Sequence, residues 1–236
     1  MTVDQSYVEE TRFGTWFIGT DTWRLRVLRR ALTDLERLLG PLRAERFPAI
    51  VDVGFGWGFS LVELDHRFRP ERLVGVDPDE QAIERAAPYA KACDVAPELL
   101  TRNAADIQLE SDAFDMVFCH QTFHHIVDQE SAMREFYRVL RPGGVLLFAE
   151  STKAYIHSWL IRWLFRHPMH VQKTAEEYIA LIRDTGFDVP PERISLPYLW
   201  WSRSDLGALE WLGVPVPARR EETLVNLVAV KPGPTP

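Results

Sequence analysis

Short apolar runs alternate with segments of helical spacing along the middle of the chain. The apolar runs predict five strands, which cover or end near residues 49–51, 72–77, 98–101, 114–119 and 145–149. Helical patterns lie between them, beginning near Phe59 and Pro78 and covering residues 129–140. Continuous apolar strands that alternate with helices indicate a parallel sheet covered on both faces. With two later strands, we predict an α/β fold with a doubly wound, mostly parallel, seven-stranded sheet.

The two ends of the chain follow a different pattern. Residues 1–45 predict a helical cap, most regular over 23–39, with Asp21-Thr22 as the expected helix start and Gly40-Pro41 as its end. After the fifth strand we expect a helical insertion or lid over residues 152–190, with helices at 155–165 and 174–183. Residues 191–231 should then supply two late strands, near 193–201 and 224–230. A single domain, 1–236, is therefore predicted around a core at 46–151.

Composition and charge exclude several classes of partner. The chain has 236 residues and a net charge of -7, without any basic run, which argues against a nucleic-acid partner. No stretch approaches the ~20 apolar residues of a membrane span, and the polar start does not resemble a secretory signal. Cys93 and Cys119 lack metal-ligand spacing and suit a reduced compartment. We expect a cytoplasmic protein that is a monomer or homodimer.

A glycine-rich turn follows the first predicted strand. It reads Asp52-Val53-Gly54-Phe55-Gly56-Trp57-Gly58 and leads into the helical pattern that begins at Phe59. Alternating glycines let the backbone turn sharply and let a ligand approach, and the following helix N-terminus favours polar groups. A dinucleotide-binding turn would need a glycine where Phe59 stands, so the spacing disfavours a nicotinamide-dependent dehydrogenase. The turn predicts a site for another small-molecule cofactor, with a mere tight turn as the alternative.

An acidic residue closes the second predicted strand. Asp77 lies 23 residues after Gly54, where a carboxylate in a doubly wound sheet reaches the vicinal hydroxyls of a ribose. Its alternative role is to cap the helix that begins at Pro78. The strand-end position together with the glycine turn favours ribose binding.

Three further segments carry a resemblance to a known family. They are Phe114-Asp115-Met116-Val117, Phe123-His124-His125-Ile126-Val127-Asp128 and Arg134–Gly144, the last of which ends in Arg-Val-Leu-Arg-Pro-Gly-Gly. With the glycine turn, their order and spacing over about residues 48–150 resemble class I S-adenosylmethionine-dependent methyltransferases, in particular the type 11 and ubiquinone-methyltransferase-like group. The resemblance implies a Rossmann-like sheet whose core binds S-adenosyl-L-methionine and releases S-adenosyl-L-homocysteine.

The resemblance also implies roles for individual residues. Asp52, Gly54, Gly56 and Gly58 would shape the pocket for the methionine part of the cofactor, and Asp77 would hold the ribose. Pro78 would lie against the adenine, Asn103-Ala104 would pair with the adenine edge, and the backbone carbonyl of His120 would meet the methionine amino group. Phe55 and Trp57 depart from the small residues that are usual in this turn.

Two histidines are the candidate catalytic bases. His124 and His125 follow the fourth strand at the mouth of the sheet, and imidazole titrates near neutral pH. A hydroxyl acceptor gains from a base, whereas a carboxylate acceptor is already ionised. A purely structural role for the pair is the alternative. Glu150 ends the fifth strand, where it would orient a histidine or a substrate hydroxyl, or cap the next helix.

Aromatic residues outside the core predict the acceptor site. Most of the eight tryptophans lie in the two end segments, which should cover the carboxyl ends of the strands. The candidate substrate-binding residues are Trp16, Trp23, Glu150, Tyr155 and Trp159, with ordinary core packing as the alternative for the rings. His157, His167 and His170 lack the acid or cysteine cluster of a metal site, so we expect no metal.

We therefore predict a methyltransferase that acts on an oxygen of a small hydrophobic acceptor carrying a hydroxyl or carboxyl group. Transfer to nitrogen or carbon is the nearest alternative. A cofactor-binding subunit without catalytic activity is the alternative from outside enzymology, and it would lack a closed cavity for an acceptor.

Overall fold

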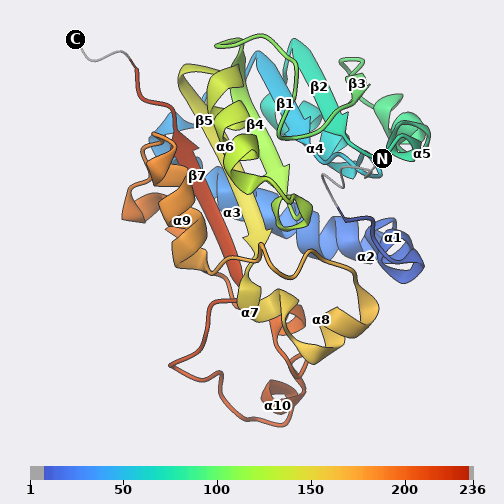
Figure 1. The fold of residues 1–236 in the computed structure, drawn as a ribbon, viewed down its shortest axis with the longest axis vertical. Helices are drawn as coiled ribbons and strands as arrows, with labels where there is room; N and C mark the ends of the chain where they lie inside the picture. The colour runs from blue at the N-terminus through green and yellow to red at the C-terminus, as the bar shows by residue number, and fades with distance from the viewer. Residues whose placement is uncertain (1–7, 234–236) are drawn as a thin grey trace.

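The computed structural model describes residues 8–233, so the first seven residues of the expected N-terminal cap lie outside the described part. A seven-stranded sheet in the order β3-β2-β1-β4-β5-β7-β6 forms its centre (Figure 1). The strands are β1 (Ala49–Val53), β2 (Arg72–Asp77), β3 (Glu98–Thr101), β4 (Phe114–His120), β5 (Leu140–Ser151), β6 (Ile194–Ser195) and β7 (Leu224–Val230). β1 to β5 pair in parallel, and β7 runs antiparallel between β5 and β6. The predicted fold class is confirmed.

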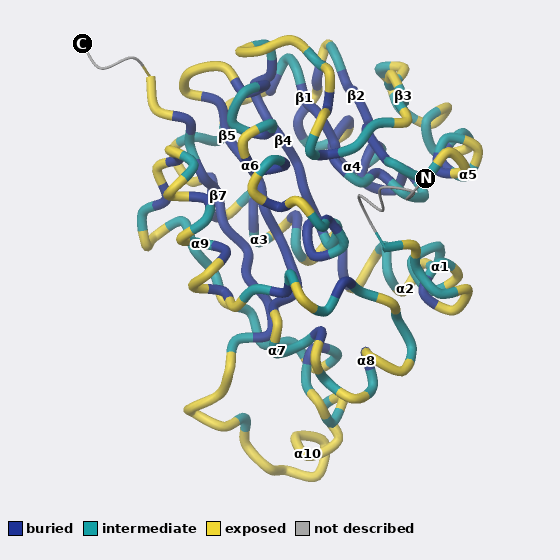
Figure 2. Tube along the Cα trace, in the orientation of Figure 1, coloured by how far each residue is buried: buried dark blue, intermediate teal, exposed yellow. Residues whose placement is uncertain are grey.

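Helices cover both faces of this sheet, as the apolar strands require. One face packs against α3 (Arg29–Leu39), α4 (Phe59–Phe68) and α5 (Gln81–Ala90). The other packs against α6 (Gln129–Val139) and α9 (Ala175–Asp184). Figure 2 shows the buried central strands between the partly exposed helices. The order of the strands reverses direction between β1 and β4, so the carboxyl ends of these two strands form the crevice in which ligands bind in open α/β sheets.

The N-terminal helical segment is less regular than its apolar spacing predicts. It consists of α1 (Arg12–Ile18), α2 (Asp21–Trp23), a π-helical stretch at Arg24–Leu28 and then α3. The expected cap at Asp21-Thr22 is wrong by one residue, because the Thr20 hydroxyl accepts the hydrogen bond from the Trp23 N–H (3.3 Å). The π-helical stretch widens the helix next to the carboxyl ends of the strands, as such stretches often do near functional sites.

The segment after β5 also differs from its expected helices and strands. The helix predicted over 155–165 is two short helices, α7 (Lys153–Ile156) and α8 (Trp159–Leu164), because Ser158 between them is extended. The strand predicted near 193–201 shortens to β6, and short 3-10 turns and α10 (Ala208–Trp211) follow. Pro197 cannot donate to a strand ladder, which explains why β6 ends before it. In Figure 1, α7, α8 and α10 lie beyond the carboxyl ends of β4 and β5.

Within residues 8–233, the helices are too short or too polar for any of them to cross a lipid bilayer. Cys93 is half-buried and Cys119 is buried, and both are free thiols.

Phe148 is a direct test of the packing between β5 and the α6–α9 face. Its ring is fully buried and lies 5.3 Å from the Phe123 ring and 5.6 Å from the Tyr178 ring between centroids. Phe148→Ala should lower the free energy of unfolding by about 3–5 kcal/mol, because it leaves a cavity. Trp211→Ala is the control, since that ring is 85% exposed and its loss should cost less than about 0.5 kcal/mol. Urea titration measures both, and equal losses would contradict this packing.

Candidate active site

The glycine turn has the backbone conformation that its sequence predicts. Gly54, Gly56 and Gly58 have φ of 80°, 50° and 82°, in the region that favours glycine. A Cβ at Gly54 would lie 2.1 Å from Thr122 Oγ1, so this residue lets β1 and the end of β4 approach closely. A Cβ at Gly56 would meet no protein atom within 4 Å. The turn is therefore packed on one side and open on the side where a ligand can approach its backbone.

Asp77 at the end of β2 is bonded to this turn. Its Oδ2 accepts a hydrogen bond from the Gly56 N–H (2.9 Å), and its Oδ1 accepts one from the Asp79 N–H (3.0 Å). Burial raises the pKa of the Asp77 carboxyl, although the two backbone N–H groups oppose that shift. Each carboxylate oxygen can accept a further hydrogen bond. The side chain thus fixes the turn and retains capacity for two hydroxyl donors of a ligand.

Asp52 lies deeper, at the end of β1. Its Oδ2 accepts a hydrogen bond from the Ser60 hydroxyl (2.5 Å), on the first turn of α4. Burial is the main cause that raises the pKa of Asp52 to about 7, with the charge of Asp77 adding to it. A buried carboxyl with one donor is ready to accept a cationic ligand group, because that group would compensate the cost of ionisation.

The two bulky residues of the turn do not fill its open side. Phe55 is buried beneath β2, where a Cβ on Gly75 would lie 2.8 Å from the Phe55 ring. The Trp57 indole N–H donates to the Thr15 carbonyl (3.1 Å) and so fastens α1 over the turn. Phe55 therefore packs the turn against β2, and Trp57 attaches helix α1 to it, so neither bulky residue blocks the open side at Gly56.

The residues expected at the adenine lie along the edge next to Asp77. Pro78 is half-buried directly after β2, and Ala104 is buried. The Asn103 Oδ1 accepts a hydrogen bond from the Ala105 N–H (3.0 Å), which shapes the loop after β3. The expected contact of this oxygen with the adenine amine would therefore use its second lone pair.

His120 forms one wall of a small pocket with Asp52 and Gly54, of about 30 Å³. Its ring lies 5.9 Å from the Trp23 ring between centroids, and burial lowers its pKa to about 4. The His120 Nε2 has no hydrogen-bond partner, and its carbonyl accepts one bond from the Thr122 hydroxyl (3.2 Å). A space of this size holds about one or two water molecules, so it marks polar groups that the amino-acid end of a cofactor would reach rather than a cavity that encloses that end. The unpartnered nitrogen, the open Gly56 and the two carboxyls fit S-adenosylmethionine.

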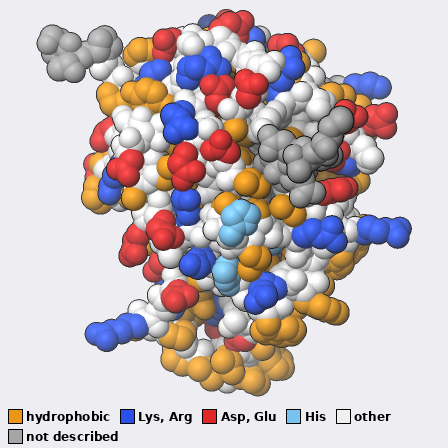
Figure 3. Space-filling view, in the orientation of Figure 1, with side chains coloured by type: hydrophobic (Ala, Val, Ile, Leu, Met, Phe, Trp, Pro, Cys, Tyr) orange, Lys and Arg blue, Asp and Glu red, His pale blue; other side chains and the backbone are white. Residues whose placement is uncertain are grey.

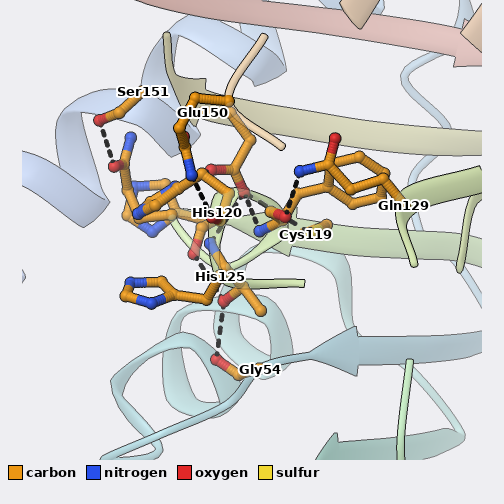
Figure 4. Close-up of polar contacts among 12 residues, drawn as sticks. Gly54, Cys119, His120, His125, Gln129, Glu150 and Ser151 are labelled. Carbon is orange, nitrogen blue, oxygen red and sulfur yellow. Dashed lines mark hydrogen bonds and ion pairs between the residues drawn. The ribbon is translucent and has the colours of Figure 1, made fainter. Parts of the chain in front are cut away.

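Glu150 joins this region to the two histidines (Figure 4). Its Oε1 accepts hydrogen bonds from the N–H groups of Thr122 (2.8 Å) and Phe123 (2.7 Å), and its Oε2 lies 2.6 Å from His124 Nδ1. The side chain is fully buried and does not line a substrate cavity. Of the three roles predicted for Glu150, the contacts support orientation of a histidine. The side chain bonds the turn after β4 rather than capping the next helix, α7, and it does not line the cavity where a substrate hydroxyl would lie.

The second candidate base lies in a cluster that sequence spacing does not reveal. The ring centroids of His124, His125 and His167 are 4.5 to 5.1 Å apart, and Glu10 Oε2 lies 3.8 Å from His125 Nε2. Burial, together with the neighbouring imidazoles, lowers the pKa of His125 well below its ordinary value and that of His167 to about 2. Both rings are therefore neutral at neutral pH. His167 packs against the rings of His124, His125 and Phe165 rather than lying on the surface.

An apolar cavity of about 250 Å³ opens beside this cluster. Trp23 and Tyr155 line it as predicted, whereas Trp16 and Trp159 are 62% and 70% exposed and lie outside it. Further wall residues come from all of the flanking segments, and they include Glu10, Phe17, Gln121, Phe165, His167 and Trp201. Phe17, Phe165 and Trp201 belong to the aromatic end segments expected to cover this site. For Glu10, Gln121 and His167 the sequence offers no signal, because the segments that carry them meet only in the folded chain.

Residues 51–148 match the family described as a methyltransferase domain. The chain is 30% identical over 146 residues to 2-methyl-6-phytyl-1,4-hydroquinone methyltransferase 2 of Oryza sativa subsp. japonica, which covers 61% of this chain and 40% of that protein. It is 28% identical over 151 residues to 27-O-demethylrifamycin SV methyltransferase of Amycolatopsis mediterranei, which covers 63% of this chain and 53% of that protein. The chain thus spans about half the length of these relatives. Other similar proteins carry names of N- and C-methyltransferases.

The fold is also similar to that of a solved enzyme. The plantazolicin methyltransferase BamL, solved with a triazolic desmethylPZN analog and SAH, aligns with a TM-score of 0.66 at 16% identity, over 93% of this chain and 90% of that chain. At 16% identity this structural similarity supports the fold alone, whereas the sequence matches support the family. The glycine turn, the sheet order and the match over residues 51–148 agree, and together they support a class I S-adenosylmethionine-dependent methyltransferase core in this part of the chain.

Proposed function

We propose that the chain transfers the methyl group of S-adenosylmethionine to an oxygen of a small hydrophobic acceptor. The observation that carries this proposal is the apolar cavity of about 250 Å³ next to the glycine turn and its two carboxyls. Trp23 lines this cavity and His120 lines the small pocket at Asp52, and their ring centroids lie 5.9 Å apart. A methyl donor at the turn and an acceptor in the cavity would meet at this pair.

The residues of the turn would bind and orient the cofactor. Asp77 would accept hydrogen bonds from the ribose hydroxyls, and Asp52 with the His120 carbonyl would face the methionine ammonium. The sulfonium supplies an activated methyl carbon, and an acceptor oxygen attacks it in line as the carbon–sulfur bond breaks. This reaction depends mainly on holding the two reactants together away from water. The cap of α1 over Trp57 supports such exclusion of water.

The cavity favours a compact acceptor. A cavity of roughly 150 Å³ holds a benzene molecule, so about 250 Å³ suits a molecule of one or two rings. Trp23, Tyr155 and Phe165 supply apolar walls, while Gln121 and Ser151 supply polar groups that are hydrogen-bonded to each other (2.6 Å). This lining suits an acceptor with an apolar body and one hydroxyl or carboxyl group.

His124 and His125 remain the candidate bases for a hydroxyl acceptor. Both line the cavity, and Glu150 holds His124 by its Nδ1 so that Nε2 is the free nitrogen. A neutral imidazole accepts a proton as the oxygen attacks. Transfer to nitrogen or carbon stays an alternative, because relatives include all three types. The presence of an apolar cavity large enough for an acceptor favours an enzyme over a subunit that only binds the cofactor.

Asp77→Ala tests the ribose contact. It should weaken binding of S-adenosylhomocysteine, measured by calorimetry, by more than about tenfold, or ~1.4 kcal/mol. Glu84→Gln is the control, because Glu84 is exposed on the neighbouring helix α5 and should leave the affinity unchanged. Unchanged affinity in Asp77→Ala, with a normal thermal unfolding midpoint, would exclude the ribose assignment.

The raised pKa of the Asp52 carboxyl leads us to expect that a proton is released when the cofactor binds. Below about pH 7 its carboxyl is mostly protonated in the free protein, because burial raises its pKa to about 7. A methionine ammonium beside it would lower that pKa, so binding near pH 6.5 should release up to about one proton per ligand. Calorimetry of S-adenosylhomocysteine in buffers of different ionisation enthalpy measures the number. The release should shrink near pH 8 and vanish in Asp52→Asn; release that persists in that variant would contradict the assignment.

An acceptor screen tests the transfer itself. Purified protein with methyl-labelled S-adenosylmethionine, offered pools of hydrophobic acids, phenols and alcohols, should form a labelled product. Leu164→Trp narrows the cavity and should lower that rate by about tenfold or more without changing cofactor affinity. Leu209→Trp is the control, because Leu209 is 53% exposed and outside the cavity. Cofactor binding without any labelled product would favour the subunit that lacks activity.

A further inference from the structure

Three histidines from two separate segments converge on one wall of the acceptor cavity. His124 and His125 lie on the 3-10 turn Phe123–His125 after β4, and His167 lies in the loop after α8. One ring nitrogen of each lies within 4.8 Å of a ring nitrogen of the other two. Imidazole nitrogens gathered at such distances can share one metal ion through their ring lone pairs. Neutral imidazole is the form that binds a metal ion.

The first histidine is already held as a metal ligand is usually held. Glu150 Oε1 accepts two backbone N–H groups, so the 2.6 Å contact at Oε2 is donated by His124 Nδ1–H. In the tautomer that donates Nδ1–H to Glu150, His124 presents the lone pair of Nε2 to a metal ion. Metal-bound histidines almost always donate their second ring N–H to a carboxylate or carbonyl in this manner.

The other members of the cluster add an unpartnered nitrogen and a negative charge. His167 Nδ1 is buried without a hydrogen-bond partner, which is costly unless another group binds it. Glu10 is bonded through Oε1 to the N–H groups of Thr11 (2.7 Å) and Arg166 (2.8 Å), while its Oε2 faces His125 at 3.8 Å. The carboxylate therefore places a counter-charge next to the three imidazoles.

We propose that His124, His125 and His167 bind one divalent transition-metal ion, with Zn²⁺ as the best fit, at the wall of the acceptor cavity. Imidazole ligands select zinc and its neighbours over Mg²⁺ or Ca²⁺, which prefer oxygen. A Zn–N bond of about 2.1 Å in a tetrahedron places the ligand nitrogens roughly 3.4 Å apart. The ring nitrogens lie within 4.8 Å of one another, so the distances between them need to shorten by about an ångström. Rotation of the side chains supplies such a change.

The ion would have an open position toward the cavity. Three histidines plus one exchangeable ligand is the pattern of catalytic rather than structural zinc sites. Because the three ligands and Glu10 all line the cavity, an acceptor oxygen could occupy the fourth position. An ion there would orient that oxygen and favour its ionised form. It would do so in place of proton transfer to His124 or His125, because the ion occupies the lone pairs that a base would use. This consequence rests on the proposed function, whereas the binding of the ion does not.

A second group of possible ligands on the chain lacks these features. Asp65, His66 and Asp94 also approach one another, but His66 and Asp94 are exposed. The Asp65 oxygens already accept the N–H groups of Asp94 (2.7 Å) and Val95 (3.3 Å). This group serves as the internal control for adventitious binding.

The test is a metal titration of the whole chain, purified without a histidine tag and stripped with a chelator. Titration with Co²⁺, followed by the visible absorption of four-coordinate cobalt, and with Zn²⁺ by calorimetry should show one ion per chain at neutral pH. His167→Gln should weaken binding by at least about 100-fold, since loss of even an outer partner of a ligand costs ~10–100-fold. His125→Gln is the second variant. His170→Gln and His66→Gln, both at exposed positions, should bind as the wild type does.

Thermal unfolding gives a second readout and checks the folding of each variant. Zn²⁺ should raise the unfolding midpoint of the wild type and of His170→Gln, but not that of His167→Gln. Absence of stoichiometric binding, or equal affinity in wild type and a folded His167→Gln, would overturn the proposal. Neither cofactor nor acceptor is present in the titration, so a positive result stands even if S-adenosylhomocysteine fails to bind the glycine turn.

Discussion

The buried carboxylate of Glu150 is the constraint on which both halves of the site depend. A charge without solvent access is costly unless donors surround it, and here two backbone N–H groups and an imidazole supply them. These bonds tie the end of β5 to the turn after β4. On one side of that turn Thr122 packs against Gly54, and on the other His124 reaches the cavity wall. One side chain thus links the segment that packs on the glycine turn to the segment that forms the cavity wall.

The N-terminal segment completes what the sheet begins. Trp57 of the glycine turn bonds α1, and Trp23 of α2 lies between His120 and the cavity. Glu10, just before α1, reaches the histidine cluster and also the backbone of Arg166 in the lid. The cap therefore contacts the cofactor turn, the histidines and the lid. The exposed aromatic and aliphatic side chains gather at the end of the molecule that holds α10 (Figure 3), beyond the cavity, where Trp200 and Trp211 are 52% and 85% exposed.

Much of the core could be predicted because its signals are local. The apolar runs gave five strands in their correct places, and the glycine spacing marked a turn whose positive φ values follow from residue type. The place of Asp77 at the end of β2 also followed from the sequence, and there the carboxyl bonds the glycine turn. The complete cavity wall could not be predicted, because its residues come from distant parts of the chain. His167 lies 42 residues after His125, and Glu10 lies 114 residues before His124. Whether the side chains of Trp16 and Trp159 face the cavity or the solvent likewise depends on how their short helices pack, which the sequence pattern does not determine.

A crystal structure with bound S-adenosylhomocysteine tests the central claim, that donor and acceptor meet at the Trp23–His120 pair. We predict that its ribose hydroxyls bond Asp77, its amino-acid end lies against Asp52, and its sulfur lies beside His120 with the open side toward the cavity. A sulfur that faces away from the cavity, or a ligand bound elsewhere on the sheet, would contradict this account.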